Sequence, residues 1–156
     1  MKLPLLGLAG LLFAETSFAC VCAGPFTAEQ RQAAAARIAA EAVGIAEIEL
    51  AQPMDHDAMR PEQYRVLTVH LGKVPEQFAL ARDFERTPTG EVLMTMTSCD
   101  VVPPPGERTL VVLYRGPGAG TFRIGGTCDH MFINSEGAVD LVRAEALRLG
   151  SAGERG

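Results

Sequence analysis

Four cysteines are the residues of this chain whose types and spacing point most directly to chemistry, and two of them stand together in Cys20-Val21-Cys22. The other two, Cys99 and Cys128, lie far along the chain. Free thiolates can hold a soft metal ion, whereas oxidised cysteines form disulfides that fix a segment in place. The compartment decides between these chemistries, and the start of the chain predicts the compartment.

Residues 1–19 have the layout of a secretory signal peptide. One positive charge at Lys2 precedes an apolar run, and a short polar stretch follows it. Ser17 and Ala19 are small residues at the positions before the cut, so cleavage after Ala19 would leave Cys20 as the first residue. We therefore expect an exported protein, periplasmic or secreted, whose N-terminus is a cysteine.

Two other interpretations of the leader remain open. A membrane anchor is one, but the apolar run is well short of the roughly 20 residues that a spanning helix needs, and we expect no membrane insertion after signal cleavage. Lipoprotein processing is the other, because a cysteine follows the cut, although that pathway usually has Leu or a similar residue where Ser17 stands. Lipidation would acylate the amine of Cys20.

The composition predicts one small exported domain. Without the leader about 137 residues remain, enough for a single core, and we place the domain at 20–150 and a frayed tail at 151–156. A formal net charge of −5, no Trp and only 2 Tyr argue against nucleic acid as a partner. No nucleophile–base pair or closed metal-ligand set stands out among the 3 His residues, so we predict no enzyme and no cofactor.

The four cysteines allow three disulfide pairings. A bond between Cys20 and Cys22 would close a very small strained ring, so we expect each of them to cross to Cys99 or Cys128. Each bridge would enclose on the order of a hundred residues, and the chain-entropy model then gives roughly 4 to 5 kcal/mol of stabilisation. Loss of Cys99 or Cys128 should therefore harm folding.

The remaining pattern predicts a small closed β barrel with flanking helices. Thr27 followed by Gln30 is a capping box, and Gly44 inside an alternating segment indicates a bend or bulge. The predicted helices cover 27–38 and a C-terminal stretch after Asn134 or Ser135, with Val139, Val142, Ala146 and Leu149 on one face. The predicted strands cover 41–50, 64–71, 78–84, 92–97, 109–114 and 121–124, with an exposed loop at 51–63.

Asp55-His56-Asp57 in that loop could be read as a metal site. Three adjacent residues rarely converge on one ion without more distant partners, so we favour a solvated loop tip. We interpret His70 as a strand residue on a partly covered face rather than a ligand.

The order of these features resembles a known family. A mature N-terminal Cys-x-Cys, a short helix, and then in order Ala42-Val43-Gly44, Leu71-Gly72-Lys73, Thr97-Ser98-Cys99-Asp100, a long apolar strand and Gly126-Thr127-Cys128 are similar to the inhibitory domain of the tissue inhibitors of metalloproteinases. That family belongs to the netrin-like domains. The resemblance covers essentially the whole mature chain and implies an OB-type five-stranded barrel with a disulfide-linked N-terminal segment.

The resemblance also implies a pairing and a site. Cys20 would bond Cys99 and Cys22 would bond Cys128, while the α-amino nitrogen and carbonyl oxygen of Cys20 would chelate the catalytic zinc of a target metalloendopeptidase. Val21 would enter the first primed-side pocket of the protease, as the residue between the two cysteines does in the family. The neighbouring inhibitory residues would be Ala23, Thr97 and Ser98. The family usually has Pro where Gly24 stands, and the third disulfide of its inhibitory domain is absent here.

The implied chelation makes physical sense. A catalytic zinc keeps one coordination position open for water, which a bidentate neutral donor can displace. An N-terminal amine with a pKa near 7.7 to 8.0 reaches the unprotonated state at small cost near neutrality. Disulfides on both sides of Val21 would hold the segment in its bound shape and reduce the ordering entropy of binding.

Two further functions stay open. One is a netrin-like module that binds another exported protein through its barrel face or loops, without inhibitory activity. The other is copper handling, since Cys20-Val21-Cys22 and Met94-Thr95-Met96 offer soft ligands. Oxidised cysteines would remove the thiolates that copper needs, and alternating Met is more often a strand face.

Overall fold

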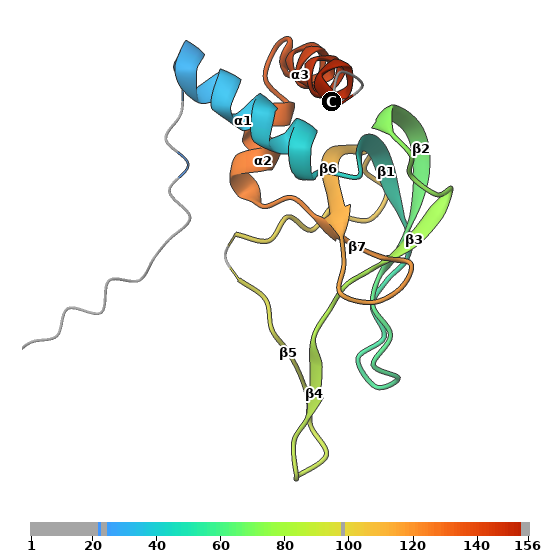
Figure 1. Cartoon of the computed structure of the whole chain (residues 1–156). Coiled ribbons are helices and arrows are strands. Elements are labelled where there is room, and N and C mark those ends of the chain that lie inside the picture. The colour runs from blue at the N-terminus through green and yellow to red at the C-terminus, as the bar shows by residue number, and fades with distance from the viewer. Residues whose placement is uncertain (1–21, 23–24, 98, 154–156) are drawn as a thin grey trace, which may run out of the picture.

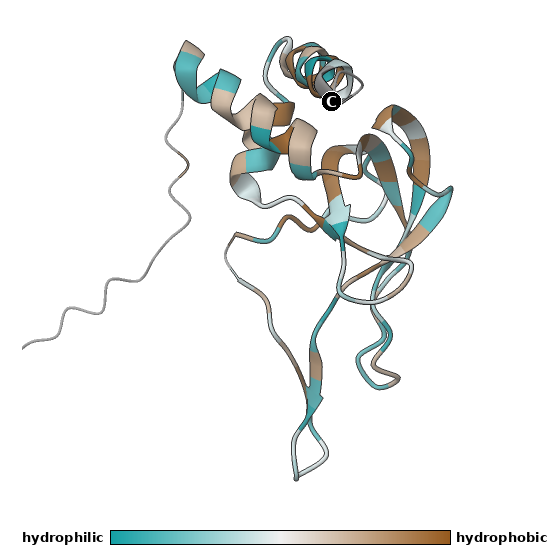
Figure 2. Cartoon of the chain, viewed as in Figure 1, coloured by the Kyte–Doolittle hydropathy of each residue, from teal (hydrophilic) through white to brown (hydrophobic). Residues whose placement is uncertain are grey.

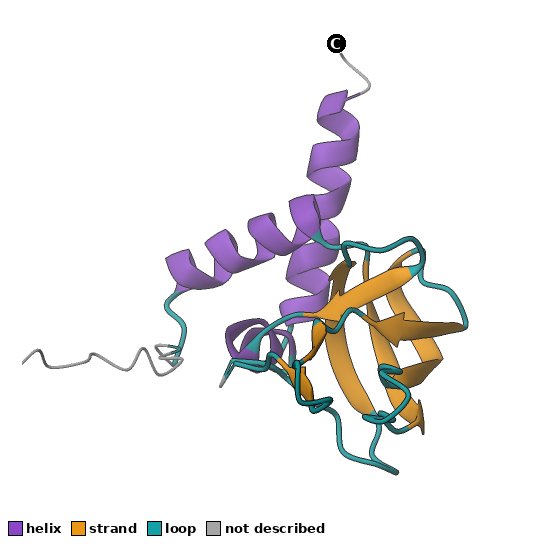
Figure 3. Ribbon diagram, turned by 90° about the horizontal axis from the view of Figure 1, so that it is seen from below, coloured by secondary structure: helices purple, strands orange, loops and turns teal. Residues whose placement is uncertain are grey.

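The core of the structure is a closed β barrel. The three helices among the described residues lie on one side of it (Figures 1 and 3). The computed structural model describes residue 22 and residues 25–97 and 99–153. Strand order around the barrel is β1-β2-β3-β7-β6, with antiparallel neighbours except for the parallel pair β3 and β7. The barrel strands are β1 (Gly44–Gln52), β2 (Gln63–Gly72), β3 (Gln77–Leu80), β6 (Thr109–Arg115) and β7 (Thr121–Ile124).

The first helix, α1 (Ala28–Glu41), begins as the sequence predicts. Thr27 is its N-cap, and the capping box with Gln30 is formed in both directions, at 3.2 and 2.8 Å. The helix continues past the predicted end at Ile38, because the alanine-rich run and Glu41 keep good helix formers to its last turn. Glu41 is therefore helical, and the prediction that a strand starts there is wrong.

Strand β1 begins at Gly44, where a side chain has no room. A Cβ at Gly44 would lie 2.5 Å from the carbonyl oxygen of Leu71 on the paired strand β2. The register between β1 and β2 shifts just after Ile45, which places an irregularity beside the predicted bend. The close approach of two backbones explains why glycine occupies this corner of the barrel.

Two hydrophobic clusters lie on opposite sides of β1 and β6, and Figure 2 shows the largely hydrophobic colouring of β6. On β6, Val112 faces the helices while Val111 and Leu113 face the barrel interior. The interior cluster is Ala46, Ile48, Tyr64, Phe78, Leu80, Val111 and Leu113. The cluster between barrel and helices is Ala35, Ile38, Ile45, Val112, Phe132, Ile133, Ala138 and Val142.

The segment predicted as one strand, 78–84, is divided between two sheets. β3 ends at Leu80, and β4 (Phe84–Arg86) pairs with β5 (Val92–Met94) in a separate hairpin that projects from the barrel (Figure 1). Between them lies Arg82, whose buried side chain pairs with Glu62, and the chain leaves the barrel at this point. Val92–Met94 is extended as predicted and delivers Cys99, but as one strand of this hairpin.

The C-terminal region contains two helices where the sequence predicted one. α2 (Thr127–Ile133) was missed, and α3 (Ala138–Gly153) follows it. Val142 is buried as predicted, but Leu149 is exposed, and buried Ala138 and Glu145 lie on the packed face instead. Ser151 lies in α3, so the predicted frayed tail begins too early.

The fold class predicted from the sequence is confirmed at the level of a mainly β domain with a closed five-stranded barrel and flanking helices. The predicted leader at 1–19 lies outside the described residues. None of the helices among the described residues is long and apolar enough to cross a membrane.

Candidate functional site

The cysteine pairing can be compared directly with the structure at one bridge. Cys22 and Cys128 form a disulfide between residues 106 positions apart, which confirms that predicted pair. Cys99 is also disulfide-bonded. Cys20, Val21, Ala23 and Ser98 lie outside the described residues, so the predicted chelating group and its neighbours remain predictions.

The turn that carries Cys99 lies against the start of α2, next to Cys128. The carbonyl oxygen of Cys99 accepts a hydrogen bond from the backbone N–H of Thr127 at 2.9 Å and another from the Thr127 hydroxyl at 3.2 Å. A Cβ on Gly126 would lie 3.2 Å from the same oxygen, so this part of the chain also approaches closely. The segments of Cys99 and Cys128 are therefore neighbours.

The turn itself, from Thr97 to Asp100, is held by its own side chains. The Asp100 carboxylate accepts the backbone N–H of Thr97 at 2.7 Å, and the N–H of Asp100 donates to the Thr97 carbonyl at 3.1 Å. The N–H of Cys99 donates to the Thr97 hydroxyl at 3.3 Å. Thr97 was predicted as a site residue, and the structure brings it beside Cys99, although as a turn residue.

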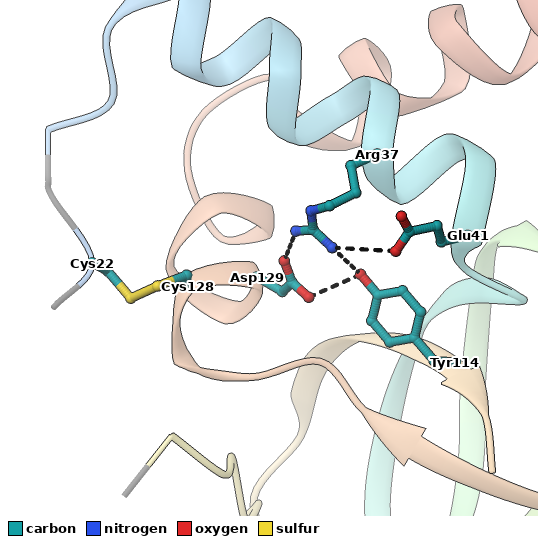
Figure 4. Close-up of polar contacts among 6 residues, drawn as sticks. All are labelled: Cys22, Arg37, Glu41, Tyr114, Cys128 and Asp129. Atoms are coloured by element: carbon teal, nitrogen blue, oxygen red, sulfur yellow. Dashed lines mark hydrogen bonds and ion pairs between the residues drawn. A yellow bond between two sulfur atoms is a disulfide. The ribbon is translucent and has the colours of Figure 1, made fainter. Parts of the chain in front are cut away.

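Behind the disulfide, Asp129 ties α2 to α1 and β6 (Figure 4). This buried carboxylate accepts a hydrogen bond from Arg37 of α1 and another, at 2.8 Å, from the Tyr114 hydroxyl of β6. Arg37 also donates to the Tyr114 oxygen at 2.9 Å and lies 4.0 Å from Glu41. Cys128 thus lies on a short helix, and the residue after it, Asp129, is held by contacts with both α1 and β6.

The charges in this network act on one another. Burial, followed by the hydrogen bond to Asp129, raises the pKa of the Tyr114 hydroxyl to about 12. Burial opposes the charge of Arg37, but its hydrogen bonds to Asp129 and Tyr114 outweigh that effect, so the pKa of Arg37 is raised. Tyr114 therefore stays neutral and Arg37 charged at ordinary pH.

A polar pocket of about 530 Å³ lies between this network and the Cys99 turn. Arg37 and Tyr114 of the network line it, and so do Thr97 and Asp100 of the turn. Arg82, at the rim of the barrel, also lines it. The pocket thus separates the helix network from the turn that carries Cys99.

The other candidate ligand groups do not converge. Among the described residues no group of three or more His, Cys, Asp and Glu side chains could hold a metal ion. Asp55 pairs with Arg60 at 2.7 Å and accepts the N–H of Ala58 at 3.0 Å, as expected for a solvated loop tip. These hydrogen bonds lower the pKa of Asp55.

Copper binding through thiolates meets a direct obstacle. Cys22, Cys99 and Cys128 are all disulfide-bonded, so none of these sulfurs is available as a thiolate. Met94 lies on β5 and Met96 follows that strand. His70 lies on β2, as predicted, where its carbonyl accepts a hydrogen bond from Arg143 at 3.3 Å.

Sequence reasoning missed several residues that shape the site. Arg37, Tyr114 and Asp129 are distant in the chain, and no local pattern connects them. Asp100 and Thr127 stand inside the quoted cysteine motifs, and a polar residue directly beside each distal cysteine was the signal available. The chain was also compared with protein-family models, curated proteins and solved structures, and none of them matches it.

Proposed function

We propose that this chain is an exported inhibitor of zinc metalloendopeptidases, similar to the tissue inhibitors of metalloproteinases. The mature N-terminus would be the inhibitory group: the α-amine and carbonyl of Cys20 would chelate the target's zinc, and Val21 would enter the adjoining pocket. A bidentate neutral donor suits the open position of a catalytic zinc. The barrel would be of the OB type and would serve as the scaffold.

One observation carries the proposal: Thr127 binds the carbonyl of Cys99, so the two distal cysteines lie in adjacent segments. Cys22 is bonded to one of them, Cys128. If Cys20 is bonded to the other, Val21 is restrained on both sides at a single place on the surface. Such pre-organisation reduces the entropy lost on binding.

The surroundings of the disulfide also support the proposal. Cys128 and Met131 lie three residues apart on α2, so their side chains share a face of that helix. Met131 is exposed, and so are Met96 and Val102 on the chain around Cys99. Exposed apolar residues close in sequence to the two distal cysteines are suitable for contact with a protein surface.

A titration tests the proposal. A broad-specificity zinc endopeptidase is titrated with the exported, oxidised protein and, in parallel, with a variant that carries one extra alanine before Cys20. We expect stoichiometric inhibition by the first and none by the second, since the extension removes only the chelate. Equal inhibition by both would refute the role of the amine.

A second function is favoured by a separate observation. The β4–β5 hairpin projects from the barrel, and Leu93 on it and Met96 beyond it are 52% and 46% exposed. Exposed apolar side chains on a projecting element are typical of a binding surface. A netrin-like module that binds another exported protein is therefore the alternative. Absence of inhibition by either protein in the titration, with the disulfides intact, would favour it.

A further inference from the structure

A buried ion pair lies at the rim of the barrel, between a residue just before β2 and one just after β3. Arg82 donates to both carboxylate oxygens of Glu62, at 3.1 and 2.9 Å, and the two side chains are only 7% and 8% exposed. A backbone bond also joins the two segments, because the N–H of Leu80, two residues before Arg82, donates to the Glu62 carbonyl at 3.0 Å. Removing two charges from water is costly, so such a pair is weak evidence for stability and invites a search for another role.

Asp100 is the residue of the turn whose charge acts on Arg82. Arg82, Thr97 and Asp100 line the same pocket. Burial opposes the charge of Arg82, but the hydrogen bonds and charge of Glu62, with the charge of Asp100, outweigh it and raise the pKa of Arg82. Two of the five guanidinium N–H groups reach Glu62, and the rest remain for a second carboxylate.

Asp100 in turn sets the backbone that carries Cys99. Its carboxylate accepts the N–H of Thr97 at 2.7 Å, and its own N–H closes the turn on the Thr97 carbonyl at 3.1 Å. The carbonyl of Cys99 then meets Thr127 of α2. Hydrogen bonds thus run from Asp100 to the residue beside Cys128, and Arg82 lines the same pocket as Asp100.

We propose that Glu62, Arg82 and Asp100 are positioning residues for the inhibitory segment: the buried pair attracts the Asp100 carboxylate, and Asp100 holds the Thr97–Asp100 turn in the geometry against which the N-terminus is fixed. The effect of these residues on inhibition rests on the proposed function. Their effect on the turn does not depend on that function.

The first test is Asp100→Asn, which keeps an oxygen that can accept the Thr97 N–H but removes the charge facing Arg82. Asp100 is exposed, so the variant should fold. We expect about tenfold faster hydrogen exchange at the Thr97 amide and about tenfold weaker inhibition, with little change in melting temperature. Because the attraction is electrostatic, the exchange difference should shrink at about 1 M salt. Asp140→Asn on α3, an exposed acid in an ion pair with Arg143, is the matched control.

The second test exchanges the members of the buried pair, Glu62→Arg with Arg82→Glu. The exchange keeps an ion pair but turns a negative group toward Asp100. We expect it to loosen the turn and weaken inhibition more than Asp100→Asn does, and we expect adding Asp100→Asn to this double variant to recover part of both. A merely stabilising pair would not produce that recovery. If the exchanged protein does not fold, Asp100→Asn alone decides.

Unchanged Thr97 exchange in Asp100→Asn would overturn the inference, and so would a folded exchanged variant whose turn matches that of the wild type. If the wild type inhibits no zinc endopeptidase, the proposed function fails, and the Thr97 exchange rates still decide whether these residues hold the turn.

Discussion

The Cys99 carbonyl oxygen accepts two hydrogen bonds from Thr127, one from its backbone N–H at 2.9 Å and one from its hydroxyl at 3.2 Å. This relationship joins the turn of one cysteine to the helix of another. Thr127→Val preserves the shape and the backbone bond but removes the hydroxyl. We expect a loss of about 1 kcal/mol in the free energy of unfolding, measured by urea denaturation. A variant as stable as the wild type would show that the hydroxyl contributes nothing.

The disulfide between Cys22 and Cys128 should contribute strongly to stability. It closes a loop across 106 positions, for which the chain-entropy model gives about 4 to 5 kcal/mol, and native disulfides typically contribute about 2 to 5 kcal/mol. The double variant Cys22→Ser with Cys128→Ser avoids an unpaired thiol. We expect the free energy of unfolding, measured by urea denaturation, to fall by about 2 to 5 kcal/mol. A change below about 1 kcal/mol would contradict the expected contribution.

The two tyrosines should respond in opposite ways to loss of their hydroxyls. Tyr64 is fully buried, and its hydroxyl has no hydrogen-bond partner among the described residues, whereas that of Tyr114 bonds Asp129 and Arg37. Tyr64→Phe should be neutral or stabilising, and Tyr114→Phe should cost about 1 to 2 kcal/mol. Thermal unfolding of the two variants side by side measures the difference. The same sign for both would contradict the assigned contacts.

The stability of the protein should fall in alkali because of the same two side chains. Burial is the main cause that raises the pKa of Tyr64 and of Tyr114 from 10.0 to about 12. The unfolded chain therefore loses these protons at lower pH than the folded protein does. The associated stabilisation is fully present below about pH 10 and is lost as the pH rises toward about 12. Melting temperatures at pH 9, 10 and 11 should show this decline, and the variant with both tyrosines changed to Phe should show a flatter profile.

Gly125 leaves room for Asp129, because a Cβ there would lie 2.8 Å from the Asp129 carboxylate. Gly125→Ala should displace that carboxylate from Arg37 and Tyr114 and cost about 1 to 3 kcal/mol. Gly150→Ala is the matched control, since a Cβ at that position on α3 meets nothing within 4 Å and should stabilise the helix by up to about 1 kcal/mol. Equal melting temperatures for the two variants would refute the packing argument.

Local signals in the sequence predicted those parts of the fold that local interactions determine. The Thr27 capping box formed, and β7 has its predicted bounds, because the deciding residues are neighbours in the chain. The short helix α2 gave no such signal. Its N-cap, Gly126, makes no side-chain cap, and buried Asp129 and Phe132 are fixed by contacts with distant elements.

The candidate site, too, could be predicted only in part. The family resemblance implied the bond between Cys22 and Cys128, and the structure confirms it. The Glu62–Arg82 pair was not foreseen, since Glu62 was placed in an exposed loop and charged side chains normally stay in contact with solvent, and only the folded barrel buries the pair. Arg82 lies between the end of β3 at Leu80 and the start of β4 at Phe84, so the predicted single strand 78–84 is wrong.

The most direct test of the central claim is to cap the N-terminal amine. In a chain that begins at Cys20, Lys73 is the one lysine, so Lys73→Arg leaves the α-amine as the single primary amine. The oxidised Lys73→Arg protein is carbamylated with cyanate, and a zinc endopeptidase is titrated with it before and after the reaction. The account predicts stoichiometric inhibition before capping and none after it, at an unchanged melting temperature. Equal inhibition before and after capping would contradict it.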